Sequence, residues 1–420
     1  MKDKVKDKVR GHGGIRVPGM MRAIVYRGPN DLRLETVPVP RIGPRELLVR
    51  VAACGVCPTD IKKIQYAVLP PPRIYGHETA GTVAAVGPRV RGFEVGERVA
   101  LHHHVPCLEC HGCRHRAFAQ CEQYKRTGIT AGFEPAGGGY AEYVRVMPFV
   151  LPGVVKIPAR NSLLEGAMLE PVNTVLKAVN HLALLPGDTV LVAGQGPIGL
   201  MFTRLLALRG IRVVASDLME SRLELAKLFG AYLVQSPKSK GQRPSVYGKA
   251  SAHGEFKIQG SKFKVQNPRV VEGRSSREGK RRTQHATRRT EIRNPKSEIR
   301  NPKPYDAAVI AVASDDAFRL AHAQVRGGGQ VLLFSHTRRG EKTPVDLASV
   351  CVDEKDLIGS YSADFLLQDE VARLVFSRKL DVRRLITHQF PLEQTSAAVA
   401  LASNPTADSL KIVVSQITDG

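Results

Sequence analysis

Four closely spaced cysteines are the first feature of the sequence that could do chemistry. They follow the pattern C-x2-C-x2-C-x7-C and comprise Cys107, Cys110, Cys113 and Cys121. Four thiolates in so short a segment can complete a tetrahedral shell around zinc and leave no position for water. The spacing therefore predicts a structural zinc site. An iron–sulfur cluster is the main alternative, but it is disfavoured because the sequence contains no redox partner module.

A second set of potential metal ligands is dispersed along the chain. Cys57 lies in CGVCPTD, His77 and Glu78 lie in GHETAG, and Glu170 lies in LEPVNT. A thiolate, an imidazole and a carboxylate would leave zinc an open coordination position, as a catalytic site requires. Each residue also has a plainer interpretation: Cys57 as a buried thiol, His77 as a hydrogen-bonded core histidine, and Glu170 as an acid at a helix start.

Other potential ligands are interpreted as structural. The run His102-His103-His104 is expected to lie on a strand and at the surface, because adjacent strand residues point to opposite faces. Cys54 and Cys351 are expected to be buried thiols that bind no metal.

A glycine-rich turn follows TVLVA, a run typical of a buried strand, and precedes a helical pattern. Its sequence is GQGPIG, with candidate cofactor-binding residues Gly194, Gly196, Pro197, Ile198 and Gly199. Such glycines allow a tight turn and let backbone N–H groups approach a pyrophosphate at a helix start. The flanking strand and helix supply the context that the dinucleotide fingerprint needs. A glycine turn that merely packs a helix on a sheet is the alternative.

Two later residues bear on the choice of cofactor. Asp217 ends the next strand, 18 residues beyond Gly199, where its carboxylate can accept hydrogen bonds from the adenosine ribose. The same charge would repel the 2′-phosphate of NADP, so we expect NAD, with NADP less favoured. Arg222 could neutralise a 2′-phosphate, but we expect it to be an exposed helix residue.

The elements that must position these residues change along the chain. From residue 20 to about 171, short alternating strands are interrupted by Gly and Pro, a pattern typical of a β-rich barrel. From about 172 to 358, buried strands alternate with helices, which predicts a parallel, doubly wound sheet. Residues 359–420 return to the mixed pattern and are expected to close the first domain.

Two segments fit neither pattern and carry most of the net charge of +23. Residues 236–304 hold 19 Lys and Arg against 5 Asp and Glu, and residues 1–22 hold 7 against 2. We predict that 1–19 and 236–304 are disordered. Tandem repeats such as TEIRNPK-SEIRNPK indicate a translated repetitive DNA element, with an evolved arm that binds nucleic acid or a partner as the alternative. Since positive and negative charges nearly balance in the rest of the chain, we expect no nucleic-acid partner.

No apolar run approaches the roughly 20 residues of a membrane span. The charged N-terminus also lacks the apolar segment of a secretory signal. We therefore expect a cytoplasmic protein that does not contact a membrane.

Together the motifs resemble those of the zinc-dependent medium-chain alcohol dehydrogenases, particularly the sorbitol (polyol) and threonine dehydrogenase branch. The resemblance rests on CGVCPTD, GHETAGTVAAVG, the four cysteines, GGGYAEYV, LEPVNT, GQGPIG and LIGSYS. It implies an α/β protein with a GroES-like β-barrel catalytic domain (20–171 and 359–420) and a Rossmann doubly wound parallel sheet (172–358), the latter interrupted by the insert 236–304.

The resemblance also implies roles for individual residues. Cys57 and His77 would bind a catalytic zinc, with Glu78 as a ligand or close neighbour and Glu170 completing or approaching the shell. Thr59 would pass on the proton of the alcohol, and Asp60 would orient the ligands. The implied reaction transfers hydride from a secondary alcohol, polyol or related hydroxy compound to NAD. A homodimer or homotetramer is expected by the same resemblance.

Two departures from the family weaken parts of this expectation. Lys62 stands where the branch commonly has His, which weakens the inference of a substrate. The insert occupies the place of a crossover helix of the Rossmann sheet, so a dehydrogenase with impaired or no turnover is one alternative. A zinc-independent quinone or enoyl reductase of the same superfamily is another, but it leaves Cys57, His77 and the four cysteines without a role.

Overall fold

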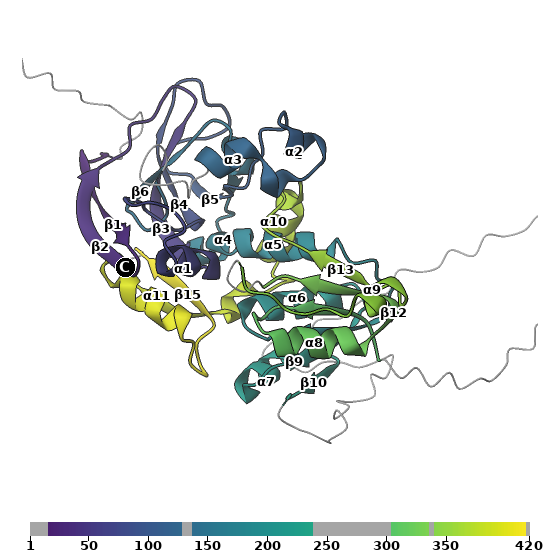
Figure 1. The fold of residues 1–420 in the computed structure, drawn as a ribbon. Helices are drawn as coiled ribbons and strands as arrows, with labels where there is room; N and C mark the ends of the chain where they lie inside the picture. Colours follow the sequence, from purple (N-terminus) through teal and green to yellow (C-terminus); the bar gives the residue numbers. More distant parts are fainter. Residues whose placement is uncertain (1–15, 128–136, 238–303, 336–339, 417–420) are drawn as a thin grey trace, which may run out of the picture. The chain divides into compact units, whose positions relative to one another are not determined.

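The computed structural model describes residues 16–127, 137–237, 304–335 and 340–416 (Figure 1). The predictions for residues 1–15 and 238–303, including disorder, the repeats and the displaced crossover helix, lie outside the described residues. The boundaries expected between the two domains stay predictions.

Among the described residues, the GroES-like part is built on a seven-stranded sheet of order β14-β15-β3-β4-β5-β7, with β6 also pairing with β3. The strands β15 and β6 share one edge of β3: β15 pairs along Ala53–Gly55 and β6 along Leu47–Arg50. The C-terminal strand thereby joins the sheet that the N-terminal part begins. The strands are β3 (Leu47–Gly55), β4 (Glu78–Val86), β5 (Arg98–Leu101), β6 (Tyr143–Val146), β7 (Val155–Lys156), β14 (Ile386–Phe390) and β15 (Lys411–Ser415).

A two-stranded antiparallel sheet, β1 (Met20–Gly28) and β2 (Asp31–Pro38), packs beside this sheet. Ile24 and Tyr26 are buried on β1. The backbone N–H of Ile24 donates to the carbonyl of Tyr140 at 2.8 Å, which ties the hairpin to the chain that precedes β6.

The second sheet is parallel throughout, with order β10-β9-β8-β11-β12-β13. In chain order this is 3-2-1-4-5-6, the doubly wound order in which a dinucleotide binds where the winding reverses, here between β8 and β11. The predicted fold class is therefore confirmed. The strands are β8 (Thr189–Ala193), β9 (Arg212–Ser216), β10 (Leu233–Gln235), β11 (Tyr305–Ile310), β12 (Val325–Leu333) and β13 (Asp356–Gly359).

Both faces of the parallel sheet are covered, which explains the continuous apolar runs of its strands. Along β8, Val190 and Val192 face one apolar cluster that contains Phe202, while Leu191 faces another that contains Phe318. Phe202 belongs to α6 (Pro197–Leu208) and Phe318 to α8 (Asp315–Gln324). The two helices thus cover opposite faces of the sheet.

The helix α5 (Leu169–Val179) links the two parts of the chain. It follows α4 (Leu163–Ala167), whose start is fixed by a capping box between Ser162 and Glu165. Val172 and Leu176 of α5 are buried in the same apolar cluster as Met201 and Phe202 of α6. Each such fully buried side chain contributes roughly 1.5–3 kcal/mol. This packing holds the start of α5, and with it Glu170, against the nucleotide-binding part.

The other described helices are α1 (Pro58–Gln65), α2 (His111–Arg114), α3 (Glu122–Thr127), α7 (Glu220–Leu228), α9 (Leu347–Cys351), α10 (Gln368–Phe376) and α11 (Thr395–Ser403), with 3-10 turns at Phe118–Gln120, Leu151–Gly153, Phe365–Leu367, Val382–Arg384 and Leu392–Gln394. No helix in the described part of the chain has the length and apolar character that a bilayer crossing requires.

Candidate catalytic and nucleotide-binding site

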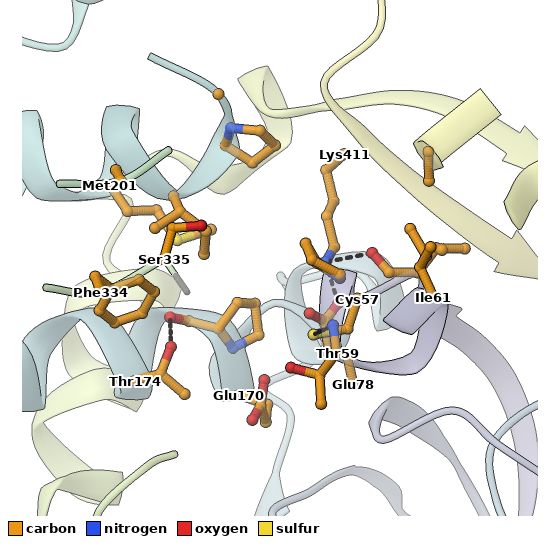
Figure 2. A pocket seen from close by; sticks show the side chains of 18 of the residues that line it. Cys57, Thr59, Ile61, Glu78, Glu170, Thr174, Met201, Phe334, Ser335 and Lys411 are labelled. Atoms are coloured by element: carbon orange, nitrogen blue, oxygen red, sulfur yellow. Dashed lines mark hydrogen bonds and ion pairs between the residues drawn. The ribbon is translucent and has the colours of Figure 1, made fainter. Parts of the chain in front are cut away.

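One pocket, with a cavity volume of about 380 Å³, contains both kinds of predicted site residue (Figure 2). The predicted metal ligands among its lining residues are Cys57, His77, Glu78 and Glu170. The predicted cofactor-binding residues that line it are Gly196, Pro197, Ile198 and Arg222. Residues of the two motif groups, which come from different parts of the chain, therefore share one cavity.

Cys57 is positioned by the turn from β3 into α1. It is the N-cap of α1, and its sulfur accepts a hydrogen bond from the backbone N–H of Thr59 at 3.5 Å. His77 directly precedes β4, and Glu78 is the first residue of that strand. One ligand atom each of Cys57, His77 and Glu78 lies within 4.8 Å of the others. This donor set of thiolate, imidazole and carboxylate fits a zinc ion with an open position.

Asp60 orients the histidine of this set. Its Oδ2 lies 3.0 Å from Nδ1 of His77, and the Asp60 side chain is fully buried. Burial alone would lower the pKa of His77, but the charges of Asp60 and Cys57 raise it well above its ordinary value. A carboxylate behind one ring nitrogen leaves the other nitrogen for a metal, an arrangement common around zinc-binding histidines.

Glu78 is paired with a lysine from the other end of the chain. The ammonium group of Lys411, the first residue of β15, forms an ion pair with Oε2 of Glu78 and donates to the carbonyl of Val56 at 3.0 Å. Burial would lower the pKa of Lys411, but the Glu78 charge raises it above its ordinary value. The pair holds the Glu78 carboxylate at the edge of the pocket (Figure 2).

Glu170 lies in the same pocket but beside other partners. Its carboxylate forms a potential metal-ligand group with His103 and His104, with ligand atoms within 4.8 Å of one another. Burial raises the pKa of Glu170 to about 7. Cys57, His77 and Glu78 therefore form one group, and Glu170, at the start of α5, belongs to a second group that lines the same pocket.

The interpretation of His102, His103 and His104 as strand and surface residues is wrong. The strand β5 ends at Leu101, so the alternation of strand side chains does not apply to the next three residues. All three histidines are buried, and His103 and His104 both line the pocket. Cys351 is likewise exposed, contrary to the expectation, whereas Cys54 is buried.

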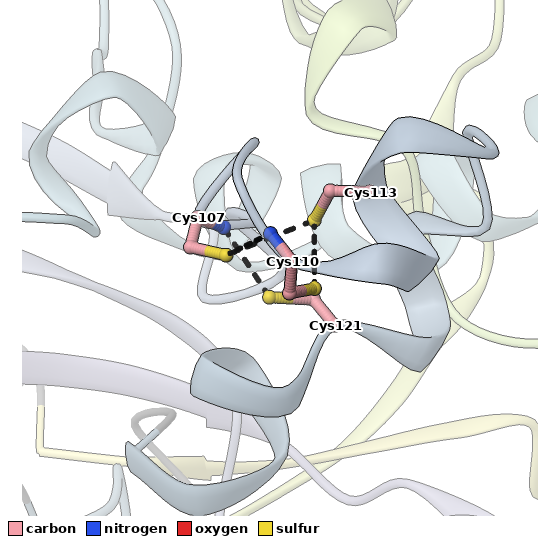
Figure 3. A group of neighbouring side chains, drawn as sticks. All are labelled: Cys107, Cys110, Cys113 and Cys121. Carbon is pink, nitrogen blue, oxygen red and sulfur yellow. Dashed lines mark hydrogen bonds between the residues drawn. The ribbon is translucent and has the colours of Figure 1, made fainter.

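The four predicted cysteines converge in a separate lobe (Figure 3). The sulfurs of Cys107 and Cys113 are 3.9 Å apart, and those of Cys110 and Cys113 are 3.5 Å apart. Zinc–sulfur bonds of about 2.3 Å in a tetrahedron place sulfurs about 3.8 Å apart. Backbone N–H groups of Cys107 and Tyr124 donate to the sulfur of Cys121 at 3.2 and 3.5 Å. The cluster therefore fits one tetrahedral zinc ion.

The glycine-rich turn connects β8 to α6. Gly194 has a φ of +91°, and a side-chain carbon at Gly199 would lie 1.7 Å from the carbonyl oxygen of Gly194. Gly196 caps α6, and a carbon added there would meet nothing within 4 Å. Two glycines thus shape the turn, while Gly196 keeps space open in front of the helix N-terminus, where a pyrophosphate would bind.

Asp217 supports this turn directly. Its carboxylate accepts hydrogen bonds from the backbone N–H groups of Gln195 at 2.6 Å and Met219 at 2.9 Å. Arg222 is not the exposed residue that we expected: its side chain is 14% exposed, and its Nη1 lies 3.9 Å from Oδ2 of Asp217. The first turn of α7 therefore places the Arg222 side chain in the pocket, beside the Asp217 carboxylate.

Comparisons with known proteins agree with this geometry. Residues 43–159 match the family model described as the alcohol dehydrogenase GroES-like domain. The chain is 27% identical to a sorbitol dehydrogenase of Bacillus subtilis strain 168, over 95% of this chain and 98% of that protein. It is 31% identical to a probable D-xylulose reductase A of Aspergillus clavatus, over 51% of this chain and 60% of that protein.

A solved structure matches over nearly the whole chain. The alcohol dehydrogenase of Thermus sp. ATN1 is 25% identical, with a TM-score of 0.71, and the match covers 94% of this chain and 99% of that one. The chain belongs to the zinc-dependent medium-chain alcohol dehydrogenase family. It is an oxidoreductase.

Sequence reasoning missed several residues of this dehydrogenase's pocket. Lys411 was not predicted as a site residue, because its ion pair with Glu78 joins residues that are far apart in the chain. Local sequence spacing does not reveal such a contact. His103 and His104 were noticed but discounted, since the end of β5 could not be located to the residue. Tyr124, which faces His104 at a ring-centroid distance of 5.0 Å, had no motif around it.

Proposed function

We propose that this dehydrogenase oxidises a secondary alcohol group of a polyol or related hydroxy compound, with NAD as the hydride acceptor. The observation that carries the proposal is the shared pocket: Cys57 and His77 line the same cavity as Gly196 at the start of α6. A metal-bound alcohol and a nicotinamide can meet only where both sites open into one space. A zinc-independent reductase would leave this ligand set without a role.

Cys57 and His77 are proposed to hold the catalytic zinc, with Glu78 or Glu170 as the third ligand. When bound, zinc supplies Lewis acidity that lowers the pKa of the alcohol hydroxyl. Asp60 keeps His77 oriented, and Lys411 restrains Glu78. The four cysteines of the separate lobe are proposed to hold a second, structural zinc.

The Thr59 hydroxyl is proposed to accept the proton that the alcohol loses and to pass it on. Thr59 lines the pocket one turn from Lys62, which also lines it. Burial lowers the pKa of Lys62 below its ordinary value, in keeping with a place beside the proton path. The mostly apolar walls of the cavity would help to exclude water and to keep donor and acceptor aligned.

NAD is proposed in preference to NADP. The Asp217 carboxylate has lone pairs left after accepting two backbone hydrogen bonds, so it can also accept from ribose hydroxyls. Its negative charge disfavours a 2′-phosphate. Arg222 lies close enough to offset part of that charge, so the preference for NAD is expected to be moderate. We also propose a homodimer or homotetramer, which light scattering would test.

The experiment is reduction of NAD and NADP by the zinc-replete protein over polyols, simple secondary alcohols, sugars and L-threonine. We expect NAD-linked oxidation of at least one polyol or secondary alcohol, and its loss in Cys57→Ser. The exposed Cys351→Ser is the matched control and should keep full activity. Equal activity of both variants, or the absence of oxidation with every alcohol, would refute the proposal.

A further inference from the structure

Two buried histidines in the pocket have no role in the proposed reaction. His103 and His104 are 2% and 8% exposed, and both line the cavity. None of the motifs that carry the family resemblance includes either residue. Nδ1 of His103 is buried and makes no hydrogen bond to any residue that the structure describes. A buried polar atom without a partner is costly, and beside a cavity it indicates a ligand.

Glu170 completes a group of three potential metal ligands with these rings. One ligand atom each of His103, His104 and Glu170 lies within 4.8 Å of the others. This group shares no residue with the group that contains Cys57 and His77. The two groups lie close together, since the ring centroids of His103 and His77 are 5.0 Å apart. The pocket therefore contains two separate sets of metal ligands.

The contact between His104 and Glu170 fits a shared metal ion better than a hydrogen bond. Nδ1 of His104 lies 3.2 Å from Oε1 of Glu170, yet it makes no hydrogen bond to a described residue. Zinc bonds of about 2.0–2.1 Å in a tetrahedron place neighbouring ligand atoms about 3.3 Å apart. Packing holds the rings, because the ring centroids of His103 and His104 are 3.7 Å apart and those of His104 and Tyr124 are 5.0 Å apart.

The donor set defines the class of metal. Two imidazoles and one carboxylate favour zinc and neighbouring transition metals over magnesium and calcium, which prefer oxygen ligands. Three protein ligands leave a fourth coordination position open. Because the group contains no thiolate, we expect it to bind zinc more weakly than the group with Cys57 and to fill only when zinc is in excess.

We propose that His103, His104 and Glu170 form a further metal site, which takes up zinc in excess of the catalytic and structural ions and inhibits the enzyme. An ion there occupies part of the cavity beside Cys57 and His77, where the alcohol is proposed to bind. It also engages Glu170, which is then unavailable to the proposed catalytic zinc. The metal site stands on its own geometry, whereas the inhibition rests on the proposed function.

The test is a titration with Zn²⁺ of protein that holds two zinc ions per chain, followed by equilibrium dialysis and elemental analysis. We expect the wild type to bind one further ion per chain. His103→Phe and His104→Phe keep a ring but remove its nitrogens, and each should weaken this binding roughly tenfold or more. His115→Phe is the matched control and should bind the further ion as the wild type does. It removes an exposed histidine whose ring centroid lies 4.5 Å from that of His111, a pair that could bind zinc at the surface.

The site is contradicted by a wild type that binds no further ion, by unchanged binding in His103→Phe and His104→Phe, or by an equal loss in His115→Phe. Cobalt tests the ligands without any variant. After Co²⁺ is added to the two-zinc protein, the total bound metal should reach three ions per chain, without the charge-transfer band of a cobalt–thiolate bond. Such a band, or a total of two ions, would also overturn the site.

Activity separates the site from the proposed function. We expect NAD-linked alcohol oxidation to fall roughly tenfold or more when the further ion binds, whereas His103→Phe should keep the activity that it has without added zinc. Undiminished oxidation by a wild type that has bound the further ion would refute the inhibition. A wild type that binds the further ion but oxidises no alcohol would refute the proposed function and leave the metal site standing.

Discussion

Lys411 and Glu78 form a buried ion pair that joins the C-terminal strand β15 to the start of β4, beside Cys57. The pair lies at the edge of the proposed catalytic site, and both side chains are almost fully buried. It therefore couples the closing strand of the GroES-like sheet to the geometry of the metal ligands.

Removing one member of this pair is expected to destabilise the fold strongly. Lys411→Met leaves the Glu78 charge buried without a partner, so we expect a loss of about 3–5 kcal/mol in the free energy of unfolding. Denaturant unfolding measures this loss. Lys227→Met, which breaks the more exposed pair with Glu224, is the control and should cost less than about 1 kcal/mol. Equal losses in the two variants would contradict the account.

The glycine-rich turn predicts different outcomes for two of its glycines. Gly199→Ala places a carbon against the carbonyl of Gly194, so we expect a loss of about 1–3 kcal/mol in stability together with weaker NADH binding. Gly196→Ala has space for the added carbon but intrudes where the pyrophosphate would lie. We expect it to fold with a loss of about 1 kcal/mol or less.

Fluorescence titration with NADH distinguishes the two effects. Gly196→Ala should bind NADH at least tenfold more weakly while its thermal unfolding stays near that of the wild type. Normal NADH binding by Gly196→Ala would indicate that the cofactor pyrophosphate does not bind at the N-terminus of α6.

Asp217→Asn is expected to shift the cofactor preference toward NADP. The substitution removes the charge that repels a 2′-phosphate. The remaining oxygen can still accept from one of the two backbone N–H groups, that of Gln195 or that of Met219, which now donate to different carboxylate oxygens. The substitution also leaves Arg222 free to meet the phosphate. We expect the ratio of kcat/KM for NADP to that for NAD to rise at least tenfold. In Asp217→Asn/Arg222→Met, most of this gain should disappear, and a gain that persists would assign the phosphate to another residue.

The two zinc sites predict a defined metal stoichiometry. The purified protein should hold two zinc ions per chain by elemental analysis, and Cys57→Ser should hold one. Cys113→Ser should also lose one and in addition lose stability, because the site in the cysteine lobe would contribute to folding. Cys351→Ser is expected to keep two. A single zinc ion in the wild type would contradict one of the two assignments.

Much of this architecture could be predicted from local sequence. The parallel sheet followed from buried runs such as TVLVA, and the turn GQGPIG was recognisable because a strand precedes it and a helix follows it. The cysteine lobe was predictable because all four ligands lie in one short segment. These features share a cause, since each depends on residues close together in the chain.

Features that depend on long-range packing were not predictable. Lys411 meets Glu78 because β15 pairs with β3, and no local pattern specifies that pairing. Arg222 has the sequence context of a surface residue, yet the entry into α7 turns it toward Asp217. His103 and His104 were misassigned because we expected them to lie on a strand, whereas β5 ends at Leu101. Beyond that residue the side chains no longer alternate between opposite faces of the sheet.

The central claim is that a zinc ion at Cys57 and His77 is required for NAD-linked alcohol oxidation. The most direct test removes the more labile zinc with a mild chelator, measures the zinc that remains, and follows activity as zinc is added back. We predict that activity falls to background when one zinc ion per chain remains. As zinc is added back, activity should rise in proportion to the zinc bound until each chain again holds two ions. Full activity with one ion per chain, in a protein whose cysteine lobe still holds its zinc, would contradict the account.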